Sequence, residues 1–189
     1  MIKIGILGDI GSGKSYIAKN FGYPVFNADN EVSSLYKKNK KIFIKLKKVL
    51  PKYIHSYPIN KSEISDAILA NSFNLKKIIK IVHLEVQKKL NIFLKKNRKK
   101  KIIILDIPLL LENKINKKND ILIFVKSKNS DILKRLKKRT GYNRKLLNKF
   151  KDIQLSSDYK ISKSQFIIKN NFTKKNIEKD IKNILKEII

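Results

Sequence analysis

The 189-residue sequence contains no cysteine and no tryptophan, and it has only two histidines, four prolines and six glycines. Without cysteine, disulfide bonds, thiolate metal sites and cysteine catalysis are excluded. The longest apolar runs, 102–105 and 107–111, fall far short of the ~20 residues that a membrane helix needs. The amino-terminal residues show no small-residue cleavage site, so no secretion signal is expected. These features predict one soluble, cytoplasmic domain that does not contact a membrane.

Acidic residues are also scarce, with 15 against 45 basic ones, and the net charge is +30. Such a charge invites a nucleic-acid interpretation, but only four of the basic residues are arginine and 41 are lysine. The 32 isoleucines and 19 asparagines, like lysine, have AT-rich codons, so a biased genome is the simpler explanation. Because nucleic-acid binders favour arginine for bidentate contacts, no nucleic-acid partner is expected. The charge would still draw anionic substrates.

Apolar runs predict five strands, at 2–7, 25–29, 102–107, 121–125 and 166–168. Helices are predicted at 14–21, 31–50, 62–69, 75–94, 130–139, 144–155 and 173–188, with Ser130 as an N-cap. Alternating strands and helices favour an α/β fold with a central five-stranded parallel sheet flanked by helices. The helices between the second and third strands form an insert at one end of this sheet.

Four of the six glycines stand at positions 5, 8, 11 and 13. The run 8–15 matches the phosphate-binding pattern G-x-x-x-x-G-K-[ST], after a predicted strand and before a predicted helix. Backbone N–H groups in such a loop surround phosphate oxygens, Lys14 reaches the β- and γ-phosphates, and Ser15 binds Mg²⁺. The residues expected to bind ATP here are Gly8, Gly11, Ser12, Gly13, Lys14, Ser15 and Tyr16. The base-reading motif of GTPases is absent, which favours a small-molecule kinase.

Two aspartates follow predicted strands at the edge where ligands bind in open α/β sheets. Asp29 could accept a proton from a substrate hydroxyl, or it could serve as the N-cap of the next helix. Asp106 ends an apolar strand and could bind Mg²⁺, or it could be an ordinary strand-end residue. No cluster of metal-ligating residues occurs elsewhere, so any metal ion is expected to be Mg²⁺ brought with the nucleotide.

Three of the four arginines lie at 135, 139 and 144. Arg135 and Arg139 are four residues apart and are predicted to share one helix face, from which they could stabilise a transferred phosphoryl group. The alternative is a solvated helix face. His83 lies near the apolar stripe of the helix 75–94, where a packing role and a ligand role both stay open.

Taken together, four segments resemble the dephospho-CoA kinase family. Residues 4–15 are similar to the family's opening, and Phe26-Asn27-Ala28-Asp29 resembles its Asp-Ala-Asp segment. The run 108–113, Pro-Leu-Leu-Leu-Glu-Asn, resembles its Pro-Leu-Leu-x-Glu signature. Residues 167–171 resemble its final strand and asparagine turn.

This resemblance implies transfer of the ATP γ-phosphate to the ribose 3′-hydroxyl of dephospho-CoA, with Mg²⁺, to form coenzyme A. It implies Asp29 as the general base and Lys14, Arg135 and Arg139 as groups that stabilise the phosphoryl group. It places Asn170 near the adenine. The residues implied in binding dephospho-CoA are His83, Pro108, Leu109, Leu110, Glu112 and Asn113. The implied parts are a nucleotide core (1–29, 102–134, 156–189), a helical CoA-binding region (about 30–100) and a lid (about 135–155).

Several positions depart from the family pattern. These departures are Asp9, Tyr16, Asn27, Leu84, Thr140-Gly141 and Ser164-Gln165. None of them removes Lys14, Ser15 or Asp29. Two other functions stay open: another small kinase, such as a nucleoside monophosphate kinase, and a basic nucleic-acid-binding protein with an inactive phosphate loop. A monomer is expected, with weak self-association left open.

Overall fold

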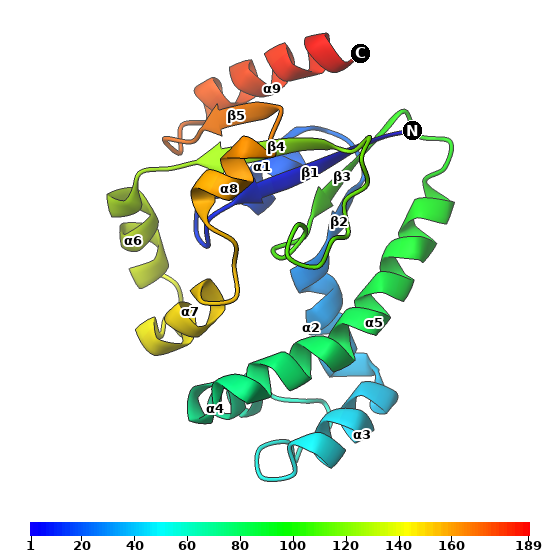
Figure 1. Cartoon of the computed structure of the whole chain (residues 1–189), viewed down its shortest axis with the longest axis vertical. Helices are drawn as coiled ribbons and strands as arrows, with labels where there is room; N and C mark the ends of the chain where they lie inside the picture. The colour runs from blue at the N-terminus through cyan, green and yellow to red at the C-terminus, as the bar shows by residue number, and fades with distance from the viewer. The chain divides into compact units, whose positions relative to one another are not determined.

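The computed structural model describes all 189 residues, and the chain divides into two compact units (Figure 1). The first unit comprises residues 1–27, 97–142 and 154–189 and contains the β-sheet. The second comprises residues 28–96 and 143–153 and is helical. None of the helices is long and apolar enough to cross a lipid bilayer.

The sheet of the first unit has five parallel strands, as predicted, in the order β2-β3-β1-β4-β5. Its strands are β1 (Ile2–Gly8), β2 (Val25–Asn27), β3 (Ile102–Asp106), β4 (Ile121–Lys126) and β5 (Phe166–Lys169). Ile4 of β1 pairs with Ile104 on one side and Ile121 on the other. All of β3 is buried, which fits a strand covered on both faces.

Helices α1 (Lys14–Asn20) and α9 (Lys174–Ile188) cover one face of the sheet (Figure 1). Their buried side chains join the inward residues of the strands in one apolar core. This core contains Ile4, Ile6, Ile17, Ala18, Phe21, Ile102, Ile104, Ile123, Val125, Ile168, Ile177, Ile181 and Ile184. The short helix α8 (Ser157–Ser162) contacts β1, and Leu110, in the turn after β3, lies against Gly5 of the same strand. Helix α6 (Asn129–Lys137) follows β4.

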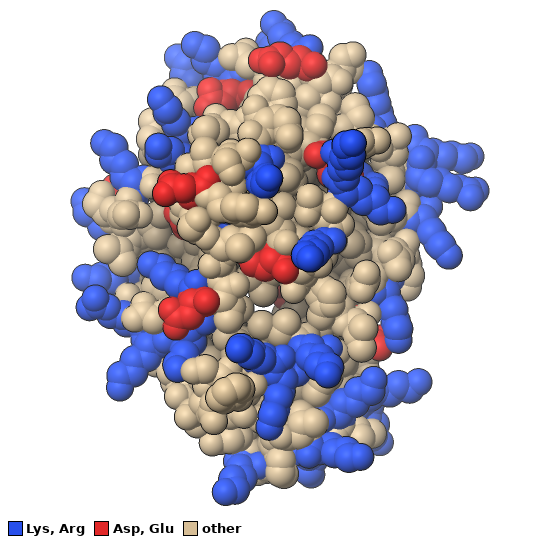
Figure 2. All heavy atoms as spheres, viewed as in Figure 1, with Lys and Arg blue, Asp and Glu red and all other residues tan.

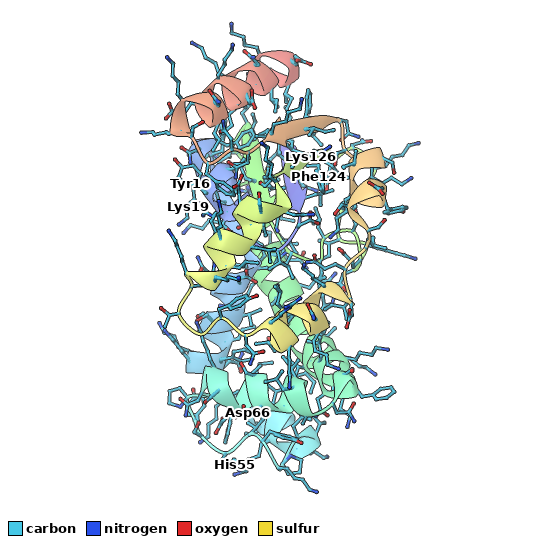
Figure 3. All side chains as sticks on the ribbon, turned by 90° about the vertical axis from the view of Figure 1, so that its left-hand side faces the viewer. Tyr16, Lys19, His55, Asp66, Phe124 and Lys126 are labelled. Atoms are coloured by element: carbon cyan, nitrogen blue, oxygen red, sulfur yellow. The ribbon has the colours of Figure 1, made fainter.

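The second unit is built around the 25-residue helix α5 (Ser72–Lys96). Helices α2 (Ala28–Lys38), α3 (Lys40–Val49) and α4 (Lys61–Ala70) pack against it, and α7 (Arg144–Lys151) packs against α4. Buried leucine, isoleucine and valine side chains line α5 at helical spacing, at Leu75, Ile78, Val82, Val86 and Leu90. Figure 3 labels His55 and Asp66, two exposed residues of this unit.

On the face of the molecule that Figure 2 shows, the basic residues do not gather in one place. In Figure 2, lysine and arginine side chains are spread over the visible face of both units, with few acidic side chains among them. This face carries no concentrated basic patch of the kind that nucleic-acid-binding proteins present.

Several predicted boundaries are wrong, among them both ends of the helix predicted at 75–94, which runs from Ser72 to Lys96. The helix predicted at 31–50 is two helices, because Asn39 adopts an extended backbone and caps a new helix. The second strand ends at Asn27, and Ala28 already begins α2. Ser130 lies inside α6, whose N-cap position is Lys128. The helix predicted at 144–155 ends at Lys151, and the unpredicted helix α8 follows it.

Replacing Asn39 with alanine should lower the free energy of unfolding by ~1 kcal/mol, the usual cost of losing an N-cap side chain. The Asn39 Oδ1 accepts a hydrogen bond from the Ile42 N–H at 3.1 Å, and alanine cannot replace it. Urea denaturation followed by circular dichroism would measure the change. Asn60→Ala is the matched control, because the Asn60 amide makes only an exposed hydrogen bond to the Ser56 hydroxyl at 3.0 Å and no capping bond to α4. Equal losses in the two variants would contradict the assigned cap.

Candidate active site

The candidate site residues of the first unit gather at the carboxyl ends of the parallel strands. Gly8 ends β1, Asp106 ends β3, and Asn27 ends β2 in register with Asp106. On β4, Phe124 is buried and Lys126, the last residue of the strand, is exposed (Figure 3). Open α/β sheets bind their ligands at this edge, so the predicted loop and the predicted acid stand where a nucleotide would be expected.

The loop 8–15 turns between β1 and α1 through a backbone that only glycine adopts readily. Gly11 and Gly13 have φ angles of 90° and 94°, in the left-handed region. A Cβ atom at Gly11 would lie 3.0 Å from Ile132 and Leu136, and one at Gly13 would collide with the Asn170 amide. The bare backbone of this loop and the first turn of α1 can therefore present N–H groups to an anion.

Two side chains hold the loop from outside it. The Ser12 carbonyl oxygen accepts hydrogen bonds from the Asn170 amide at 2.7 Å and from the Ser127 hydroxyl at 3.0 Å. The Asn170 side-chain oxygen in turn accepts from the Phe172 N–H at 2.8 Å. Ser12 is fully buried, and its own hydroxyl oxygen has no hydrogen-bond partner. A buried hydroxyl without a partner is costly, and a bound phosphate oxygen would satisfy it.

The Lys14 side chain folds back over the start of the loop. Its ammonium donates hydrogen bonds to the carbonyl oxygens of Gly8 at 2.9 Å and Asp9 at 2.8 Å. The Asp9 carboxylate accepts a hydrogen bond from the Ser157 hydroxyl of α8 at 2.6 Å, which occupies one of its oxygens. Ser15 and Tyr16, in the first turn of α1, are exposed, and Figure 3 labels Tyr16 on this helix.

Asp106 is 2 % exposed and accepts a hydrogen bond from the Asn27 side-chain amide. Asn27, which replaces an aspartate of the family pattern, thus holds the carboxylate at the end of the neighbouring strand. Asp29 lies two residues further along, in the first turn of α2 and in the second unit. Because consecutive Cα atoms are ~3.8 Å apart, the Asp29 Cα lies within roughly 7.6 Å of the Asn27 Cα.

The segment 108–113 forms consecutive turns directly after β3. Leu110 is fully buried and lies against β1, where a Cβ atom at Gly5 would be 2.5 Å from its side chain. The Asn113 N–H donates to the Leu109 carbonyl oxygen at 3.1 Å. One oxygen of Glu112, Oε1, accepts a hydrogen bond from the Leu155 N–H at 2.9 Å. The segment is therefore attached to the rest of the first unit through Leu110 and Glu112, and Pro108 begins it two residues after Asp106.

Arg135 and Arg139 do not share one helix face, contrary to the prediction, because Arg139 lies beyond the end of α6. The helix ends at Lys137, and the Arg139 N–H bonds to the Leu136 carbonyl oxygen in a turn that Gly141 continues at a φ of 75°. The Arg135 guanidinium lies over the Phe172 ring, 4.1 Å from its centroid. Because Phe172 also lies beside Gly13, the ring places Arg135 next to the phosphate-binding loop.

The first unit thus brings together the loop, Asp106, Asn170, Arg135 and the segment 108–113. Asp29 and His83 belong to the second unit. His83 lies on α5, and its buried Nε2 has no hydrogen-bond partner.

Three residues of this arrangement were missed by sequence reasoning. Ser127 and Ser157 carry no sequence signal, because neither belongs to a motif, and Phe172 stands where glycine is more usual for its φ of 64°. Two further departures from the family pattern, Ser164 and Gln165, also have partners. The Ser164 hydroxyl donates to the Lys160 carbonyl oxygen at 2.8 Å, and the Gln165 Oε1 accepts from the Leu122 N–H at 2.7 Å.

Comparison with known proteins identifies relatives over almost the whole chain. A sequence model of the dephospho-CoA kinase family matches residues 2–176. The dephospho-CoA kinase of Wolbachia pipientis wMel is 34% identical over 187 residues, which cover 96% of this chain and 95% of the relative. That of Rickettsia felis is 31% identical over 188 residues, covering 98% of this chain and 96% of the relative.

Solved structures share the fold. The protein TT1252 from Thermus thermophilus aligns with a TM-score of 0.76 at 24% identity and covers 100% of this chain and 98% of its own. A dephospho-CoA kinase from Campylobacter jejuni aligns at 0.63 with 19% identity, covering 98% and 96%. A shikimate kinase from Acinetobacter baumannii aligns at 0.51 with 12% identity, covering 100% and 93%. The predicted α/β fold with a central five-stranded parallel sheet is therefore confirmed, and it is a P-loop kinase fold.

Proposed function

Because the chain belongs to the dephospho-CoA kinase family, we propose that it transfers the ATP γ-phosphate to the ribose 3′-hydroxyl of dephospho-CoA. The products are coenzyme A and ADP. The observation that carries this proposal is the family match over residues 2–176, which includes both the phosphate-binding loop and the segment 108–113. The enzyme is accordingly an ATP-dependent phosphotransferase.

The loop 8–15 binds the phosphates of ATP. Its backbone N–H groups and the start of α1 attract the negative phosphate oxygens, and the buried Ser12 hydroxyl supplies a further hydrogen bond. Lys14 turns its ammonium from the carbonyl oxygens of Gly8 and Asp9 toward the β- and γ-phosphates. Asn170, which bonds to Ser12, supports the loop on the side where the adenine is expected.

Ser15 and Asp106 fit a magnesium ion. A hydroxyl and a carboxylate are the oxygen ligands that Mg²⁺ prefers, and the Asp106 carboxylate is buried at the strand end beside the loop. When bound with ATP, Mg²⁺ neutralises charge on the β- and γ-phosphates. Asn27 keeps the Asp106 carboxylate oriented through its hydrogen bond.

Asp29 acts as the general base. Its carboxylate takes the proton of the acceptor 3′-hydroxyl as that oxygen forms a bond to the γ-phosphorus. The bond between the γ-phosphorus and the bridging oxygen breaks at the same time, and ADP leaves with the electron pair. The short chain distance from Asn27 supports this role, since Asn27 ends a strand at the edge that carries Asp106.

The remaining predicted parts complete the proposal. The helices within about 30–100, with His83, bind dephospho-CoA, and Pro108, Leu109, Leu110, Glu112 and Asn113 form part of the acceptor pocket. The segment of about 135–155 closes as a lid, bringing Arg135 and Arg139 to the transferred phosphoryl group. The lid, the single-domain organisation, the monomeric state and a cytoplasmic location stay predictions.

The experiment that tests this function measures ADP release from ATP and Mg²⁺ with dephospho-CoA, AMP or CMP as the acceptor. We expect stimulation by dephospho-CoA alone and a product with the mass of coenzyme A. Stimulation by a mononucleotide instead would assign the chain a different acceptor. ATP binding without turnover on any acceptor would contradict the kinase function.

A further inference from the structure

A buried lysine that the proposed mechanism does not use lies on α8. Lys160 is 2 % exposed, and it is the one lysine of the chain whose side chain is buried. Its ammonium lies 3.0 Å from Oε1 of Glu112, whose side chain is 10 % exposed. A charged group is almost never buried to this degree unless it is paired, so the ion pair explains how Lys160 can occupy this position.

The partner of Lys160 belongs to the acceptor segment 108–113. Glu112 uses only one of its oxygens within the protein, because both Lys160 and the Leu155 N–H bond to Oε1. The other oxygen, Oε2, is buried and has no hydrogen-bond partner. A buried carboxylate oxygen without a donor is costly, so this oxygen is suited to accept a hydrogen bond from a hydroxyl or N–H of a bound molecule.

The same short helix is attached to the phosphate-binding loop. The Ser157 hydroxyl, one turn before Lys160, donates to the Asp9 carboxylate at 2.6 Å. Helix α8 therefore holds the loop through Ser157 and the segment 108–113 through Lys160. The loop, the segment 108–113 and α8 all belong to the first unit.

We propose that Lys160 is a positioning residue for the acceptor: it fixes Oε1 of Glu112 and so aims Oε2 at a hydrogen-bond donor of dephospho-CoA. The proposal rests on the proposed function. Ser157 positions the phosphate-binding loop for ATP, because its hydroxyl bonds to Asp9 of that loop. Replacing Lys160 should therefore change the KM for dephospho-CoA, whereas replacing Ser157 should change the KM for ATP.

The test compares KM and kcat for both substrates in Lys160→Met, Glu112→Gln and the double variant. We expect each single variant to raise KM for dephospho-CoA about tenfold with the KM for ATP changed less than about twofold. The double variant should be no worse than the worse single one, because the two residues act as a unit. Ser157→Ala should show the opposite pattern, with a higher KM for ATP alone.

Lys163→Met is the matched control, because Lys163 follows α8 with its ammonium over the exposed Tyr159 ring. It should leave kcat and the KM values for ATP and dephospho-CoA unchanged. In parallel, calorimetry would measure the dissociation constants of each variant for ATP and dephospho-CoA. These measurements would be made below the unfolding temperature of the variant. If Lys160→Met fails to fold, Glu112→Gln, which is nearly isosteric, carries the same test.

The outcomes separate the two proposals. An unmodified chain that neither binds nor phosphorylates dephospho-CoA would contradict the proposed function and this inference with it. An active unmodified chain in which Lys160→Met and Glu112→Gln behave like Lys163→Met would contradict the inference alone. A rise in both KM values together, restored in the double variant, would mean that the ion pair supports only the fold, and this also overturns the inference.

Discussion

Replacing Lys14 with methionine should lower kcat/KM for ATP by roughly 10³-fold, the scale observed when one preorganised charged or hydrogen-bonding group is removed from a transition state. Methionine keeps the length and most of the volume of the side chain and removes only the ammonium. Charge builds up on the phosphoryl oxygens as the bond to ADP breaks, and no other residue of the loop carries a positive charge.

The fold should survive this change. The Lys14 side chain bonds to two carbonyl oxygens of its own loop, whereas the loop is attached to the rest of the unit through Ser12. A coupled assay of ADP release would measure the rate, and circular dichroism would report folding. Lys19→Met, on an exposed position of the same helix (Figure 3), is the matched control and should retain full activity. A Lys14→Met enzyme with a tenth or more of the normal rate would remove Lys14 from the mechanism.

Replacing Asp29 with asparagine should lower kcat by ~100-fold or more, the usual scale for loss of a general base. Asparagine preserves the size and the hydrogen-bonding oxygen of the side chain but cannot take a proton. Because the loop that binds ATP belongs to the other unit, the dissociation constant for ATP should change less than about threefold. Rapid-quench measurement of phosphoryl transfer would separate this chemical step from product release.

Asp66→Asn is the matched control for this variant. Asp66 is an exposed aspartate of the same unit, on α4, and its replacement removes the same charge without touching the proposed base (Figure 3). Near-normal turnover in Asp29→Asn would show that the acceptor hydroxyl loses its proton elsewhere. A parallel loss in Asp66→Asn would show that the change in charge alone slows the enzyme.

The sheet and the phosphate-binding loop could be predicted closely because their signals are local. The strand 2–7 and the helix 14–21 each end within one residue of the observed bounds, since apolar runs and glycines mark them directly. The break at Asn39 was missed because lysines stand on both sides of it and the apolar residues Leu35, Ile42 and Leu46 keep a helical spacing across it. The cap itself is a single asparagine among 19.

Site residues could be predicted where their role follows from the residue type and its place in a motif. They could not be predicted where the role depends on a contact between distant segments. Asp106 at the end of β3 follows from an apolar run that ends in an acid. The burial of Lys160 could not be predicted, because nothing in the sequence separates it from the other lysines. The Arg135–Phe172 contact joins two segments far apart in the chain, which only the folded topology brings together.

The strand order has a consequence for how the chain is made. β1 is synthesised first, yet its neighbours are β3 and β4, so its backbone stays unpaired until Ile102 and then Ile121 have left the ribosome. At ~5–20 residues per second, this interval is on the order of 10 s. Throughout it, an isoleucine-rich strand edge is open to other nascent chains. Repulsion between the many lysines of such unfinished chains opposes their association.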